Sequence, residues 1–158
     1  MSKLTVKQPD AEDFGIMIAE ELEPVEMPVK EYLDIETGTY TREIFMPGGT
    51  VVVGKQHACS CVNIITKGKL IVKMDGEEGK GETIEVSEKS SHIFTSKDLG
   101  RKLLYIIEDT IFINVFSNVK AQCLADVEAE LVVPSEKYND YIKQKELAWH
   151  GQWSQEQQ

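Results

Sequence analysis

The feature that most constrains the fold is a series of short β-prone segments between residues 39 and 119. These segments are rich in β-branched and aromatic residues, and turn residues separate most of them. They span residues 40–46, 50–54, 62–66, 69–74, 82–86, 93–95, 103–107 and 110–116. We expect tight turns at Pro47-Gly48-Gly49, Lys67-Gly68, Asp75-Gly76 and Glu108-Asp109. Short strands at a spacing of about ten residues predict an antiparallel sandwich or barrel, and the lack of long helical segments between them argues against a parallel α/β sheet.

The regions on either side of this β zone differ from it in character. Residues 1–38 form an acidic arm, in which Asp10 caps a short helix that ends before Pro24. Residues 120–158 form a C-terminal extension. Residues 125–133 in it are expected to be extended or partly helical, and Ser135 is expected to cap an amphipathic helix over 135–150. The sequence thus predicts three parts, with boundaries after residues 38 and 119.

The C-terminal helix has two interpretations. Its aromatic face either packs on the sheet of its own chain or contacts a partner subunit. The residues expected to make the partner contact are Tyr138, Tyr141, Trp149 and Trp153.

The charge balance excludes several classes of function. The chain has 17 Lys and Arg residues against 27 Asp and Glu residues, a formal net charge of −10. A surface this acidic argues against nucleic acid and anionic membranes as partners. The N-terminal residues lack the apolar core of a signal peptide, no apolar run reaches the length of a membrane span, and three cysteines fit a reducing compartment. We therefore expect a protein that is neither secreted nor membrane-spanning.

The densest group of polar residues lies between Gly54 and Asn63. On an extended chain His57, Cys59 and Cys61 share one face, which makes them weak candidates for a metal site. The Cys-Ser-Cys spacing is not that of common zinc sites, and a cysteine in a strand more often behaves as a small buried hydrophobe. No nucleophile elbow or phosphate-binding glycine loop is present. We therefore expect no metal or other cofactor.

A second polar group follows Leu99. Gly100 precedes two adjacent cations, Arg101 and Lys102, which could hold a phosphate or carboxylate. The alternative is that both are solvated charges at the start of a strand.

These motifs together resemble the cupin superfamily of small β-barrels, or jelly rolls. When the first cupin motif is anchored on Gly68, its glutamate position falls on Cys61 and its two histidine positions on Lys55 and His57, so the metal motif is degenerate. The chain is more closely similar to small cupin-like proteins of tailed bacteriophages, over residues 41–50, 53–57, 63–68, 100–102 and 108–110. The resemblance implies a mainly β chain with a single cupin-like barrel at 39–119, a short N-terminal helix and a C-terminal amphipathic helix.

The resemblance also implies a location in the host cytoplasm or the virion, and a homo-oligomer. We expect a non-catalytic binding or assembly module with a phage structural partner or a small anionic ligand. The expected ligand-binding residues at the barrel mouth are Lys55, His57, Cys61, Arg101, Lys102 and Tyr105.

Two alternatives remain open at this point. In the first, the protein sequesters a small anionic host molecule such as a nucleotide signal, with Lys55 and Arg101 on the phosphate and Tyr105 stacked on the base. In the second, it is a cupin-type enzyme, either a metal-dependent dioxygenase or an isomerase or epimerase with His57 as base and Tyr105 as acid.

Overall fold

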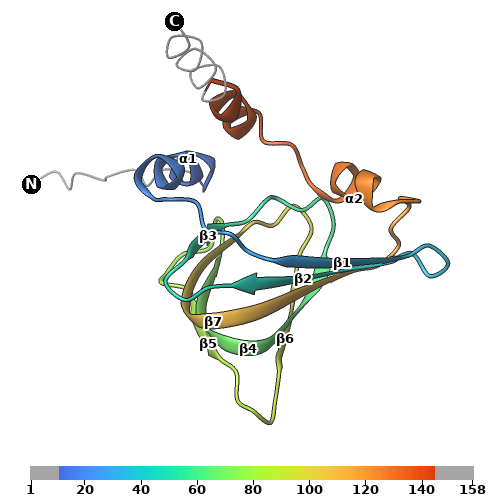
Figure 1. The fold of residues 1–158 in the computed structure, drawn as a ribbon, viewed down its shortest axis with the longest axis horizontal. Helices are drawn as coiled ribbons and strands as arrows, with labels where there is room; N and C mark the ends of the chain where they lie inside the picture. Colours follow the sequence, from blue (N-terminus) through green and yellow to red (C-terminus); the bar gives the residue numbers. More distant parts are fainter. Residues whose placement is uncertain (1–10, 145–158) are drawn as a thin grey trace, which may run out of the picture. The chain divides into compact units, whose positions relative to one another are not determined.

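The computed structural model describes residues 11–144 of the chain (Figure 1). Contacts divide the chain into two units, one made of residues 25–133 and the other of residues 1–24 and 134–158. The first unit contains β1 (Val29–Asp34), β2 (Thr39–Met46), β3 (Val51–Val53), β4 (Cys61–Met74), β5 (Glu82–Glu85), β6 (His92–Ser96), β7 (Lys102–Phe116) and α2 (Leu124–Leu131). The second contains α1 (Ala11–Glu21) and a helical segment over 136–144.

One antiparallel sheet makes up the larger unit. Its strand order is β1-β2-β7-β4-β5, with β3 also paired to β7 and β6 also paired to β4. The long strands β4 and β7 form its spine, and both bend strongly (Figure 1). The expectation of a mainly β, antiparallel fold is confirmed.

The turns expected at Lys67-Gly68 and Glu108-Asp109 are wrong, because β4 and β7 each run through without a break. The β4–β7 pairing instead shifts register three times between Ile65 and Leu70, which marks bulges. Gly68 has a φ of 117°, and a Cβ there would clash with the hydroxyl of Thr110. The glycine therefore permits close approach to β7 at a bulge, not a chain reversal.

In the Glu108-Asp109 pair, Asp109 contacts another segment of the chain and does not form a turn. Asp109 Oδ1 accepts a hydrogen bond from the backbone N–H of Gly48 at 2.9 Å. Asp109, a residue type that is typical of a turn, thus holds the 47–49 turn, which was predicted correctly, against β7.

The sheet begins earlier than the sequence predicted. β1 lies within residues 1–38, the segment assigned to an acidic arm, and pairs with β2 in register from Val29–Ile44 to Asp34–Thr39. Its charged, irregular pattern fits an edge strand that pairs on one side only. The barrel unit therefore starts before residue 39.

The helices agree with the sequence where the structure describes them. α1 ends before Pro24, while its expected cap, Asp10, lies outside the described residues. Ser135 Oγ accepts a hydrogen bond from the backbone N–H of Tyr138 at 3.3 Å, as expected of the cap of the 135–150 helix. Residues 145–150 of that helix, together with Trp153, lie outside the described residues. None of the described helices is long and apolar enough to cross a membrane.

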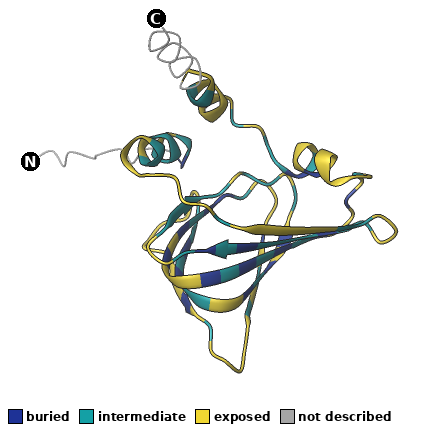
Figure 2. Cartoon of the chain, viewed as in Figure 1, coloured by how far each residue is buried: buried dark blue, intermediate teal, exposed yellow. Residues whose placement is uncertain are grey.

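Buried and exposed residues alternate along the strands of the sheet (Figure 2). The inward residues form two apolar clusters. The larger fills the centre of the barrel and includes Ile65, Leu70, Ile106 and Phe112. The smaller lies where α2 packs on the sheet, and its buried members are Tyr40, Cys61, Phe116, Val119, Val127 and Leu131. The second cluster places α2 over one end of the barrel, where the site described next is found.

Candidate functional site

A cavity of about 300 Å³ lies between α2 and the ends of β1, β2 and β7. That volume is at the lower end of the range for small-molecule sites. The apolar lining comes mainly from Phe116 and from α2, and the polar lining comes from the strands and from the segment after β3. The lining residues are Glu31, Tyr40, Arg42, Lys55, His57, Asn114, Phe116, Leu124, Ala125, Val127, Glu128, Leu131 and Val132.

The strand register brings the first polar residues of the cavity together. Glu31 on β1 pairs in register with Arg42 on β2, and Tyr40 lies two residues before Arg42 on the same face. The Tyr40 hydroxyl donates a hydrogen bond to Glu31 Oε1 at 2.6 Å. Burial and the Glu31 carboxylate raise the pKa of Tyr40. The phenol therefore remains protonated and holds Glu31 in place.

An ion pair joins α2 to the loop before β4. Lys55 Nζ pairs with Glu128 Oε1, and both side chains are more than half exposed. This hydrogen bond and the lysine charge lower the pKa of Glu128. An exposed pair of this kind contributes little stability, so Lys55 can exchange Glu128 for another anion at small cost.

His57 lies at the centre of the polar lining. Its backbone N–H donates to the carbonyl of Gly100 at 3.1 Å and its carbonyl accepts from the N–H of Leu99 at 2.8 Å. The imidazole meets the ring of Phe116 edge-on, with 5.2 Å between centroids. Burial, followed by the positive charges of Lys102, Arg42 and Lys55, lowers the pKa of His57 to about 4. The imidazole is therefore neutral at pH 7.

Arg42 contributes a second cation to the cavity. Its charge acts on His57, Tyr40 and Glu128. Within residues 11–144 it forms no ion pair with a carboxylate at 4.0 Å or less. A guanidinium that lines a cavity without a carboxylate partner is suited to bind one from a ligand.

A chain of buried polar side chains continues from the cavity into the barrel. Asn114 lines the cavity and donates to Asn63 Oδ1 at 2.8 Å, and Asn63 Nδ2 donates to Ser96 Oγ at 3.1 Å. Ser96 Oγ is 3.2 Å from Cys61 Sγ, which is 4.0 Å from Lys102 Nζ. All five residues are 8% exposed or less. The interior of this end of the barrel is therefore polar, and its polar groups are largely paired.

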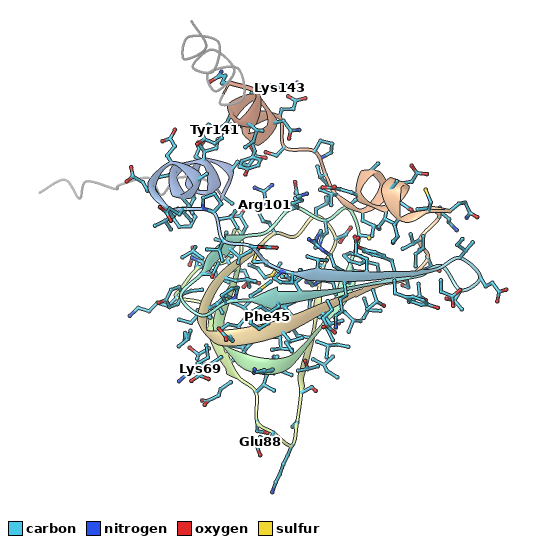
Figure 3. All side chains as sticks on the ribbon, viewed as in Figure 1. Phe45, Lys69, Glu88, Arg101, Tyr141 and Lys143 are labelled. Carbon is cyan, nitrogen blue, oxygen red and sulfur yellow. The ribbon has the colours of Figure 1, made fainter. Side chains whose placement is uncertain are left out.

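The sequence-predicted ligand residues are only partly brought together. Lys55 and His57 line the cavity, and Cys61 and Lys102 are buried in the polar chain beside it. Arg101 is buried in the segment that leads into β7 (Figure 3) and is not among the lining residues.

The expectation that Tyr105 lies at the barrel mouth is wrong. Along β7 the even-numbered residues from Lys102 to Ile106 point inward, so Tyr105 points outward and is 47% exposed. Tyr105 therefore cannot stack on a ligand in the cavity. The structure also does not bring together the His57–Tyr105 acid–base pair of the enzyme alternative.

Sequence reasoning missed several residues of the site. Glu31, Tyr40, Arg42 and Glu128 come from separate segments, and only the pairing of β1 with β2 and the packing of α2 place them around one cavity. The sequence does contain a pattern that marks Asn63 and Asn114. Each stands alone among apolar residues of a strand, at a position that faces the core.

The weak metal candidates do not converge. Cys61 contacts Ser96 and Asn63, whereas Cys59 packs against the smaller apolar cluster, and burial raises the pKa of its thiol. In the part of the chain that the structure describes, no group of three or more His, Cys, Asp or Glu side chains could hold a metal ion.

No protein-family model matches the chain, and no curated protein matches its sequence significantly. Several solved structures align with part of the chain. An RmlC-like cupin family protein with a double-stranded β-helix fold from Methanocaldococcus jannaschii is 15% identical, with 60% of this chain and 83% of that chain covered and a TM-score of 0.47. KdgF from a Halomonas species is 18% identical, with 63% and 89% covered and a TM-score of 0.47.

A cupin superfamily protein from Desulfitobacterium hafniense is 8% identical, with 74% of this chain and 96% of that chain covered and a TM-score of 0.48. Similarity at this level says nothing about activity, ligand or partner. The fold class is mainly β and is built on one antiparallel sheet, as the sequence predicted.

Proposed function

We propose that this protein is a non-catalytic binding module whose cavity takes a small organic anion bearing a carboxylate or phosphate. The observation that carries the proposal is the charge around His57. Burial is the main reason that the pKa of His57 is low, and the positive charges of Lys102, Arg42 and Lys55 lower it further, in a chain whose net charge is −10. Of the charged residues that line the cavity, Glu31 accepts a hydrogen bond from Tyr40 and Glu128 pairs with Lys55, whereas Arg42 forms no ion pair with a carboxylate within residues 11–144, so an anion is attracted to Arg42.

The lining of the cavity further restricts the ligand. Arg42 offers a planar fork of donors, and Lys55 is already paired with the carboxylate of Glu128. The opposite wall, from Phe116 and α2, is apolar. The preferred ligand therefore has one charged end and one apolar or ring-shaped end, as a small sugar phosphate or a mononucleotide has.

The wider proposals rest on the sequence motifs. We propose that the chain is one of the cupin-like proteins of tailed bacteriophages, that its metal motif is degenerate, and that it works as a homo-oligomer in the host cytoplasm or the virion. A phage structural partner would bind through the C-terminal extension.

The experiment is isothermal titration calorimetry of the full chain at low salt. The probes are inorganic phosphate, adenosine monophosphate, glucose 6-phosphate and succinate. We expect Arg42→Gln and Lys55→Gln each to weaken binding about tenfold or more, since a charged hydrogen bond contributes about 1.5–3 kcal/mol. Lys80→Gln, an exposed lysine in the loop before β5, is the matched control.

A variant that is expected to strengthen anion binding separates an effect on binding from an effect on folding. Glu128→Gln removes the resident carboxylate, so Lys55 is released and the anion should bind more tightly. No binding of any probe to the wild type, or equal binding by the Arg42 and Lys80 variants, would contradict the proposal.

A further inference from the structure

Two rows of residues on the sheet make up one wall of the cavity. In the first row Glu31 on β1 lies opposite Arg42 on β2, and Arg42 lies opposite Asn114 on β7. In the second row Tyr40 on β2 lies opposite Phe116 on β7, with 5.9 Å between the ring centroids. The rows are two residues apart along each strand, or about 7 Å. This wall therefore has a charged row beside an aromatic row.

The charged row carries two opposite charges that are not paired with each other. Glu31 and Arg42 are in-register neighbours, yet in the described part of the chain they form no ion pair at 4.0 Å or less. The hydrogen bond that Glu31 accepts comes from the neutral phenol of Tyr40 and reaches Oε1. Within residues 11–144 the structure shows no other hydrogen bond to this carboxylate and none from the Arg42 guanidinium. Both charged groups are thus available to a ligand.

The remaining charges of the lining are already paired. Lys55 Nζ pairs with Glu128 Oε1 on α2. Because His57 is neutral at pH 7, the lining holds two positive and two negative side chains, which sum to zero. A ligand whose own charges cancel therefore fits this cavity better than a dianion does.

The facing wall of the cavity is apolar and comes from α2. Leu124, Val127 and Leu131 line it, and the last two belong to the same apolar cluster as Phe116. The apolar part of a ligand is buried against this wall while its charged end stays at the Glu31–Arg42 row. A cavity of about 300 Å³ suits a small molecule of this kind.

We propose that the cavity binds an apolar α-amino acid. The α-carboxylate binds the guanidinium of Arg42, the α-ammonium group binds the carboxylate of Glu31, and the side chain packs against α2 and Phe116. An amino acid carries two opposite charges on neighbouring groups, as the charged row does on neighbouring strands. This inference rests on the proposed function, because Arg42 takes the carboxylate in both, and it names the ligand class among molecules with one charged end and one apolar end.

The test is isothermal titration calorimetry of the full chain at pH 7 with L-leucine and with two molecules that each lack one of its charges. 4-Methylpentanoate lacks the ammonium group, and 3-methylbutylamine lacks the carboxylate. We expect L-leucine to bind at least about tenfold more tightly than either, since each charged hydrogen bond contributes about that factor. Glycine has both charges but no apolar side chain, so it should also bind about tenfold or more weakly.

Substitutions in the charged row assign the two contacts. Glu31→Gln keeps an acceptor for the Tyr40 hydroxyl, so it should weaken the binding of L-leucine about tenfold without weakening that of 4-methylpentanoate. Arg42→Gln should weaken the binding of both. Glu88→Gln is the matched control, because Glu88 is an exposed glutamate in the loop between β5 and β6 (Figure 3).

The outcomes separate this inference from the proposed function. L-leucine that binds no more tightly than 4-methylpentanoate, or whose binding Glu31→Gln does not weaken, overturns the inference and leaves the anion site in place. Binding of 4-methylpentanoate that Arg42→Gln leaves unchanged, or a wild type that binds none of these molecules and none of the anionic probes, overturns the proposed function and this inference with it.

Discussion

Lys102 Nζ lies 4.0 Å from Cys61 Sγ, although the two residues stand at opposite ends of the paired strands β4 and β7. Along this ribbon Lys102 pairs with Met74, while Cys61 lies next to Val62, which pairs with Val115. The contact therefore shows that the ribbon curls until its two ends meet inside the barrel. It also places the Lys102 ammonium group in the interior, beside a thiol.

The first prediction concerns this ammonium. Lys102 is 6% exposed, and its burial lowers its pKa from the usual 10.5. Between the lowered pKa and 10.5 the unfolded chain binds more protons than the folded chain, so the free energy of unfolding rises with pH in that window. Lys102→Met should stabilise the protein at pH 7 by about 1–2 kcal/mol and flatten this rise. Urea unfolding at pH 7 and pH 10 measures the free energy of unfolding of each variant, and Lys97→Met, at an exposed lysine, is the control. A Lys102→Met variant that is less stable than the wild type at pH 7 would contradict the prediction.

The second prediction concerns the neutral imidazole of His57. Its pKa is about 4 in the folded chain, whereas an exposed histidine has a pKa of 6.5. The unfolded state therefore binds more protons between these two values, and stability falls as the pH decreases through that window. After allowance for solvent screening, His57 should account for about 1–2 kcal/mol of this loss. His57→Gln should remove that part of the difference between urea unfolding at pH 7 and pH 4, whereas His92→Gln on β6 should keep it.

Local signals predicted the strands but not their length. The Asp75-Gly76 and Pro47-Gly48-Gly49 turns follow from local conformational preference and are present. Glu108 and Asp109 have the same local appearance, yet Asp109 binds the backbone of Gly48, which is distant in sequence. A single-sequence pattern cannot separate these two uses of an acidic residue, because only the β2–β7 pairing distinguishes them.

The sequence predicted those residues of the site that lie close together along the chain. Lys55 and His57 belong to one polar segment, and both line the cavity. Arg42 and Glu31 line the cavity because β1 and β2 pair in a register that sets them side by side. This register could not be predicted from the sequence. Tyr105 was misplaced because the continuity of β7 fixes which of its residues point inward.

The third prediction tests the bulge at Gly68. Its φ is 117°, and a Cβ would clash with the Thr110 hydroxyl and lie 2.7 Å from the Asp109 carbonyl oxygen. Gly68→Ala should therefore cost about 2–5 kcal/mol from backbone strain and overpacking together. Gly76→Ala is the matched control, since Gly76 has a φ of 86° but nothing within 4 Å of the Cβ position, and should cost only about 1–2 kcal/mol. Equal midpoints of urea unfolding for the two variants would refute the close approach.

The fourth prediction separates the buried polar chain from ordinary core packing. Asn114 donates to Asn63 Oδ1 at 2.8 Å, and both side chains are buried. Asn63→Leu or Asn114→Leu leaves its partner unsatisfied in the core, at a cost of about 2–3 kcal/mol each. The double variant leaves neither amide behind, so it should cost less than the sum of the single variants by about 1 kcal/mol or more. Asn139→Leu, on an exposed helical position, should change stability by less than about 0.5 kcal/mol. Strict additivity in urea unfolding would show that the two amides are not coupled, and the polar chain could then not connect the cavity to Cys61 and Lys102.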